Sequence, residues 1–201
     1  MNSTIIGTVS GLYAGGVQPM PGDGRPTAIF KQPVQGAMAI GPEGLAGDSQ
    51  ADRRVHGGAE KAIHHFPLET HARLAALFPE AAGTLGAGTL GENISTVGIT
   101  EAEACIGDVF SLGTALVQLC QPRQPCWKIE ARHGVEGMTR AIADAGIAGW
   151  YYRVLEPGLV QAGDTRLRLR IAVAELPARR RQLEAIKLSA LLKPPPVPEL
   201  P

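Results

Sequence analysis

The segment QPRQPCWK, residues 121–128, places a cysteine among prolines and cations. Two prolines fix the backbone φ angle on the approach to Cys126, which predicts a stiff loop at the end of a strand. The positive charges of Arg123 and Lys128 lie close enough in sequence to favour the thiolate form of this cysteine over the thiol. Two interpretations stay open on these residues: a thiolate that reacts or binds a metal, or a cysteine buried in a turn, which is common for this residue.

A second segment, DRRVHGGAEK at residues 52–61, gathers three permanent cations and a histidine around a glycine pair. Backbone N–H groups beside glycine, together with arginine and lysine, are the components of an anion or phosphate site. A solvated charged loop is the commoner outcome for one such stretch. The combination of this loop with the cationic cysteine loop predicts a pocket for an anionic ligand.

Two other patterns lack the context that their chemistry needs. Three glycines have the G-x-G-x-x-G spacing of a dinucleotide-binding loop, namely Gly86, Gly88 and Gly91. Such a loop follows a strand and precedes a helix, whereas here a helix is expected before it and a strand after it. Three histidines are close in sequence, namely His64, His65 and His71, but without the ligand spacing of a zinc site. We therefore expect neither a dinucleotide loop nor a zinc centre.

Composition limits the class of protein. The chain has 201 residues with 19 basic and 19 acidic side chains, which suits one domain and argues against a general nucleic-acid binder. Its 3 cysteines are too few for a disulfide framework, and Cys105 and Cys120 lie in apolar strand patterns where a structural role is expected. We recognise no secretory signal and no membrane-spanning stretch, so we expect a cytoplasmic protein with no membrane partner.

The elements that must position these residues are mostly strands. The chain contains 25 Gly and 16 Pro, which limit regular helix, so we expect a mainly β, α+β fold with short helices. Alternating or short apolar runs predict strands within residues 4–16, 27–41, 62–66, 92–99, 105–113, 114–121 and 149–173. Helical patterns occur at 69–80, 138–146 and 177–193, and a long polar loop is expected between residues 42 and 61.

Several segments, in this order and spacing, resemble the MOSC-domain family and in particular its bacterial YiiM-type branch. They are GLAGDSQADRRVHGGAEKAIHHFP, GENISTVGIT, IGDVF, QPRQPCWK and GWYYRVLEPGLVQAGD. The resemblance implies a barrel-like β domain over residues 1–173. The apolar pattern and the prolines that follow predict a C-terminal helix at 174–193 and a Pro-rich tail at 194–201. The YiiM-type branch usually carries a longer C-terminal helical region than this chain.

The resemblance also implies a cofactor. MOSC domains bind the molybdenum cofactor, in which molybdopterin holds the metal, and the cysteine of the P-R-x-P-C element ligates the molybdenum. Here that cysteine is Cys126, and thiolate suits so soft a site. The pterin phosphate needs cations and backbone N–H groups. By motif position, the expected cofactor-binding residues are Arg53, Arg54, His56, Lys61, Asn93 and Arg123, with Asp48 and Glu92 orienting them.

The implied function is an oxidoreductase that reduces N-hydroxylated compounds, such as hydroxylaminopurines, to amines. Cys126 and His56 are the expected catalytic residues, and the histidine is expected to deliver protons. Electrons are expected from a separate reductase, because the chain has too few cysteines for an iron–sulfur cluster and no flavin-type motif. Two alternatives stay open: a sulfur carrier with a persulfide on Cys126, and a non-catalytic carrier of the molybdenum cofactor. A homodimer is also left open.

Overall fold

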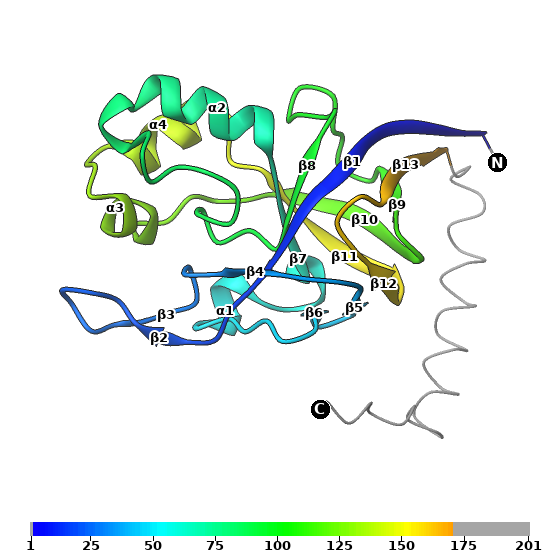
Figure 1. Cartoon of the computed structure of the whole chain (residues 1–201), viewed down its shortest axis with the longest axis horizontal. Coiled ribbons are helices and arrows are strands. Elements are labelled where there is room, and N and C mark those ends of the chain that lie inside the picture. The colour runs from blue at the N-terminus through cyan, green and yellow to red at the C-terminus, as the bar shows by residue number, and fades with distance from the viewer. Residues whose placement is uncertain (1, 171–201) are drawn as a thin grey trace.

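The structure, a computed structural model, describes residues 2–170. Figure 1 shows a strand-rich body with most of the helical residues gathered at one side of it. The helix expected at 174–193 and the tail expected at 194–201 lie outside the described residues. Within the described part of the chain, no helix is long and apolar enough to cross a membrane.

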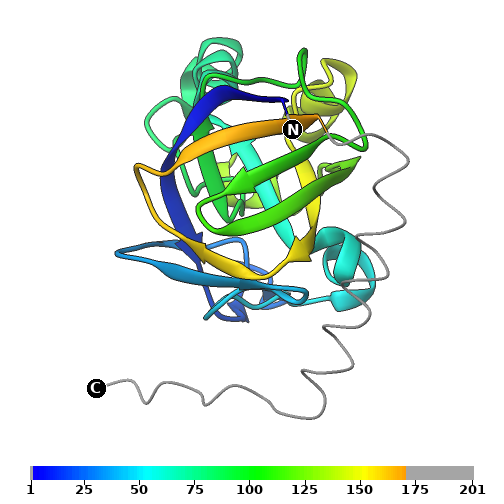
Figure 2. The same cartoon turned by 90° about the vertical axis from the view of Figure 1, so that its right-hand side faces the viewer.

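The body is a closed β-barrel. Its 8-stranded sheet has the order β13-β9-β10-β11-β7-β8-β1-β4, and a further pairing of β13 with β1 closes it, as Figure 2 shows end-on. The strands are β1 (Asn2–Ala14), β4 (Gln32–Val34), β7 (Ile63–Pro67), β8 (Ile94–Val97), β9 (Val109–Leu112), β10 (Ala115–Pro122), β11 (Trp150–Glu156) and β13 (Thr165–Arg170).

Smaller elements surround this barrel. A 3-stranded sheet contains β5 (Met38–Gly41), β6 (Gly44–Leu45) and β12 (Gly158–Val160), and a hairpin pairs β2 (Gln18–Pro19) with β3 (Pro26–Thr27). The helices are α1 (Arg53–His56), α2 (Leu68–Leu77), α3 (Lys128–His133) and α4 (Met138–Asp144), with 3-10 turns η1 (Ala59–Lys61) and η2 (Pro79–Ala81). Strands β7 and β8 run parallel, and α2 lies in the connection between them.

Two buried clusters share the barrel wall. One fills the barrel and includes Ile63, Phe110 and Tyr152, and the other packs α2, α3 and α4 against the outer face and includes Phe66 and Ile142. Because side chains alternate along a strand, β7 contributes to both clusters. Ile63 and His65 face inward. His64, which lies between them, therefore lies on the outer face of the wall, on the side of the helical layer.

Most of the strands and helices expected within the described residues are confirmed, with differences in detail. The strand expected from residue 105 begins at Val109, so Cys105 lies outside it and is exposed, which corrects the structural role expected for it. Strand β2 lies in a stretch where no strand was expected. The stretch expected as a loop between residues 42 and 61 contains β6, α1 and η1. Helix α3 was not predicted, because its 6 residues are too few to show an apolar period. This helix follows Cys126 and Trp127, so it fixes the exit of the cysteine loop.

Candidate functional site

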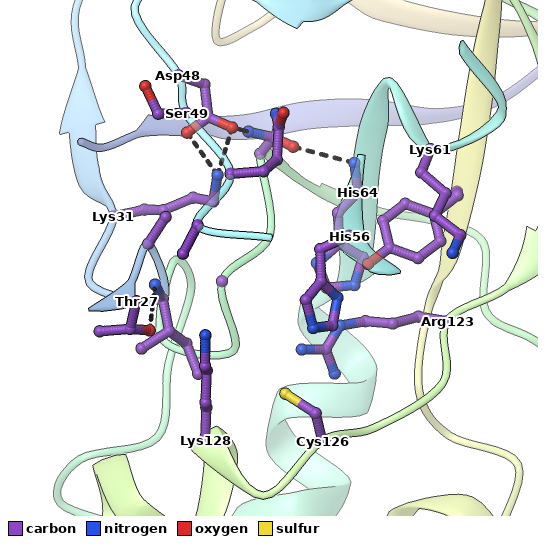
Figure 3. A pocket seen from close by; sticks show the side chains of 17 residues that line it. Thr27, Lys31, Asp48, Ser49, His56, Lys61, His64, Arg123, Cys126 and Lys128 are labelled. Atoms are coloured by element: carbon purple, nitrogen blue, oxygen red, sulfur yellow. Dashed lines mark hydrogen bonds and ion pairs between the residues drawn. The ribbon is translucent and has the colours of Figure 1, made fainter. Parts of the chain in front are cut away.

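A cavity lies on the outer face of the barrel wall at β7 and β11. The cavity volume is about 70 Å³, so the enclosed space fits one small group of a larger ligand. Its titratable lining residues are Lys31, Asp48, His56, Lys61, His64, Arg123, Cys126, Lys128 and Tyr151. Figure 3 shows that these side chains come from both sides of the cavity, with Lys31 and Asp48 opposite the histidines.

The cysteine loop forms one wall of the cavity, between β10 and α3. The Arg123 backbone N–H donates to the Gly149 carbonyl at 3.0 Å, and its side chain is buried. Burial raises the pKa of Tyr151, and the neighbouring Arg123 side chain opposes that rise. Cys126 is half-buried, and its carbonyl accepts the Ile129 N–H at 3.0 Å, where α3 begins. In Figure 3 the Arg123 guanidinium and the Cys126 sulfur face the same space. The loop therefore presents a cation beside a thiol.

The opposite wall contains a buried ion pair. Lys31 Nζ lies 2.5 Å from both carboxylate oxygens of Asp48, and the two side chains are 6% and 2% exposed. Burial lowers the pKa of Lys31, and the carboxylate of Asp48 opposes that shift. Asp48 also accepts the Gly15 N–H at 3.0 Å and Asn93 Nδ2 at 2.8 Å. Its oxygens are thus fully used, and it holds Lys31 at the cavity.

Asn93 connects this ion pair to β7, because its Oδ1 accepts the His64 backbone N–H at 3.0 Å. The neighbouring Glu92 is fully buried and does not line the cavity. Its carboxylate accepts the backbone N–H groups of Gly88 and Leu90 and the Nε2–H of His71. Burial opposes ionisation of Glu92, yet the hydrogen bond and the charge of His71 hold its pKa below the ordinary value. Glu92 therefore shapes the loop that presents Asn93.

His56 and Lys61 enter the cavity from α1 and η1. Burial lowers the pKa of His56 to about 4, with further lowering by the charges of Arg123, Lys128 and Lys61. The ring is therefore neutral near pH 7. Lys61 Nζ donates to the Val55 carbonyl at 2.5 Å. Because the neutral ring has no second proton to give, His56 could deliver a proton only by relaying it from water.

The structure does not bring Arg53 and Arg54 into the cavity. Their side chains are 65% and 90% exposed, and each is paired locally, Arg53 with Glu43 and Arg54 with Asp52. Helix α1 has 4 residues, none of them buried, so only its last residue, His56, reaches the cavity lining. The sequence lacked a signal to separate these neighbours, because one helical turn spreads them around the axis.

Sequence reasoning missed other lining residues. Lys31 lies in a strand-like run, His64 was considered only as a zinc ligand, and Tyr151 lies within an apolar strand. The ladder pairs His64 with Tyr151, and their ring centroids are 5.2 Å apart. Strand alternation could have placed these two rings on one face if the register had been known.

The charge of the lining suits an anion. Four basic side chains line the cavity, Lys31, Lys61, Arg123 and Lys128, against one carboxylate, Asp48. Because Asp48 is paired with Lys31, a positive excess faces the ligand. A thiol at the same cavity adds a soft ligand for a metal. The donor set therefore fits an anionic ligand that carries a soft metal.

Known proteins resemble this chain over most of its length. The family model described as MOSC domain matches residues 52–166. Protein YiiM from Escherichia coli is 40% identical over 151 residues, which are 75% of this chain and 67% of that protein. A Gibberella moniliformis protein named Reductase is 33% identical over 140 residues, 69% of this chain and 25% of that protein. The crystal structure of YiiM from Geobacillus stearothermophilus has a TM-score of 0.64 and 28% identity, covering 94% of this chain and 91% of that one.

Proposed function

Because the chain belongs to the MOSC domain family, we propose that it is a molybdenum cofactor-dependent oxidoreductase that reduces N-hydroxylated compounds to amines. The observation that supports this proposal is the meeting of Cys126 with buried Arg123 in a cavity of positive excess. Hydroxylaminopurines and related hydroxylamines are the proposed substrate class. The protein named Reductase supports the oxidoreductase part of the proposal.

The lining residues fit the cofactor by their chemistry. Cys126 would ligate the molybdenum, since thiolate matches a soft metal. Arg123, Lys61 and Lys128 would pair with the pterin phosphate or its neighbouring anionic groups, as arginine and lysine commonly do. Asn93 and His56 would offer hydrogen bonds to the polar edges of the ligand. When bound, the cofactor supplies two-electron redox chemistry suited to cleaving an N–O bond.

The proposed reaction converts R–NH–OH, two electrons and two protons into R–NH₂ and water. The N–O bond breaks, the oxygen leaves as water, and nitrogen is reduced. His56 would pass protons from solvent to the departing oxygen, because its depressed pKa keeps the ring neutral between turnovers. Arg123 would keep a positive charge beside the Cys126 sulfur. Electrons would come from a separate reductase.

The test uses the full chain purified from a host that makes the molybdenum cofactor. Molybdenum and pterin per chain are measured beside the rate of 6-hydroxylaminopurine reduction with an artificial electron donor. We expect near-stoichiometric cofactor and measurable reduction in the wild type. Cys126→Ser should lose reduction by at least about 100-fold, since a hydroxyl is a poor partner for a soft metal. Cys105→Ser, at an exposed thiol outside the cavity, is the matched control.

Wild-type protein without molybdenum and without reduction would refute the proposed function. A labile sulfur on Cys126 in such metal-free protein would instead support the sulfur carrier. Stoichiometric molybdenum without reduction of any N-hydroxylated compound would support a carrier of the cofactor.

A further inference from the structure

His64 carries a buried polar atom that the protein leaves without a hydrogen-bond partner. The residue is 3% exposed, and its Nε2 has no partner. His64 also lines the cavity between the two cationic walls. Leaving a buried ring nitrogen unpaired destabilises a fold, so such an atom needs a reason to be retained.

The ring is directed to the cavity by strand alternation. Its neighbours His65 and Ile63 face the barrel interior, where His65 is hydrogen-bonded to Tyr152 and Thr96. His64 lies on the other face and, in Figure 3, extends toward His56 and Arg123. The bond from its backbone N–H to Asn93 fixes the strand at this position. The unpaired atom is therefore held in place.

The surroundings also determine which ring nitrogen carries the proton. Burial holds the pKa of His64 well below its ordinary value, and Arg123 adds to this effect, so the ring is neutral. The Gly91 backbone partly opposes this shift, as a carbonyl near a ring N–H does. Since Nε2 has no partner, we assign the ring proton to Nδ1, which leaves the lone pair on Nε2. Nε2 is thus an acceptor in a cavity lined mainly by donors.

We propose that His64 Nε2 accepts a hydrogen bond from an N–H or O–H group of the ligand bound in this cavity. Two ligand groups share this chemistry: a pterin N–H of the cofactor, and the N–OH group of the substrate. In the second case, which rests on the proposed function, His64 favours hydroxylamines over N-oxides, because the oxygen of an N-oxide carries no hydrogen. His64 is then a specificity residue that nothing in the cysteine motif indicates.

The acceptor assignment is tested first, and independently of any metal. Nitrogen-15 NMR of the full chain, purified without molybdenum, reports which ring nitrogen of His64 is protonated. We expect the Nε2 resonance of an unprotonated nitrogen from pH 6 to pH 8. A protonated Nε2 would overturn the proposal even if the chain proves to be a reductase.

The ligand group is then identified with His64→Phe, which fills the space without an acceptor, and His64→Gln, which restores one. Molybdenum and pterin per chain are measured, followed by kcat/KM for 6-hydroxylaminopurine and for its isomer adenine 1-N-oxide. A roughly tenfold lower cofactor content in His64→Phe, recovered in part by His64→Gln, assigns the pterin N–H. Unchanged content with a roughly tenfold lower kcat/KM for the hydroxylamine alone assigns the substrate N–OH.

The proposal fails if both variants retain wild-type cofactor content and the wild-type ratio of the two kcat/KM values. His133→Gln is the control for losing a buried histidine, because His133 bonds Thr84 and Thr89 in the helical layer and does not line the cavity. If His64→Phe does not fold, the NMR measurement still decides whether Nε2 is an acceptor. Failure of the wild type to carry cofactor would refute the proposed function. The NMR result on the His64 ring does not depend on that outcome, because it is measured without the cofactor.

Discussion

At the scale of single residues, the cavity holds its two histidines neutral. Burial is the main cause for both His56 and His64, and the charge of Arg123 is the next. An unfolded chain removes both causes, so each histidine regains a pKa near 6.5 when the protein unfolds. The unfolded state therefore binds protons in a pH range where the native state does not.

This difference predicts a stability that falls with acidification. For His56 the native pKa is about 4, so the free energy of unfolding should decrease as the pH falls from about 6.5 to about 4. Urea unfolding at intervals across this range measures it. His56→Gln should show a shallower decrease, because only the other histidines with lowered pKa values, His64 and His133, then contribute. An equally steep decrease in His56→Gln would show that His56 is charged in the native protein.

The site residues that could be predicted are those carried by compact motifs. His56, Lys61, Asn93, Arg123 and Cys126 all line the cavity as placed by motif position. Their roles toward a cofactor stay predictions. The role of Lys31 could not be predicted. A lysine in a strand-like run gives no sign that it will be buried in an ion pair with a carboxylate 17 positions away.

At the scale of elements, the Lys31–Asp48 pair connects the segment after β3 to the segment after β6. Asp48→Asn should destabilise the protein by about 3–5 kcal/mol, because it leaves the Lys31 ammonium buried without its counter-charge. The double variant, which also carries Lys31→Met, should lose less free energy of unfolding than the two single variants lose in sum. Urea unfolding of the four proteins measures this coupling.

Arg140 and Asp144 supply the control for that cycle. They form an ion pair at 3.4 Å on α4, with side chains 87% and 70% exposed. Arg140→Ala should change the unfolding midpoint little, since exposed pairs are screened by water. Equal effects from the buried and the exposed pair would contradict the assigned role of Asp48.

The turn before β11 depends on one glycine. Gly149 has φ +67°, its carbonyl accepts the Arg123 N–H, and an added Cβ would lie 2.2 Å from the His65 carbonyl oxygen. Gly149→Ala should therefore cost clearly more than the roughly 1–2 kcal/mol of left-handed backbone strain alone. Gly146→Ala is the matched control, because Gly146 has φ +64° and open space around its Cβ position. Similar thermal midpoints for the two variants would contradict this contact.

Elements with a clear apolar pattern could be predicted, whereas those set by tertiary contacts could not. The strand run from Ile94 to Pro122 and helix α4 follow their sequence patterns. Helix α1 depends on a side-chain cap, in which Asp52 accepts the Arg54 N–H, and it has no buried residue. Such short helices draw little stability from their own sequence, so the pattern was typical of a loop.

At the scale of the whole molecule, the two buried clusters share one wall, so we expect them to unfold together. Trp127→Phe leaves Trp150 as the remaining tryptophan, in the barrel cluster. Its fluorescence in urea should give the same midpoint as far-UV circular dichroism, which also reports the helices. Separate midpoints would show that the helical layer unfolds without the barrel.

The closure of the barrel by β1 and β13 also orders events during synthesis. Asn2 lies opposite Arg170. Strand β1 therefore cannot pair with β13 until the ribosome has added the residues between them. Until that pairing forms, β1 offers an open edge to other nascent chains, and a chaperone that shields it would assist folding. Under the proposed function, a cofactor that requires the finished wall would be inserted only after β13 has been synthesised and has paired with β1.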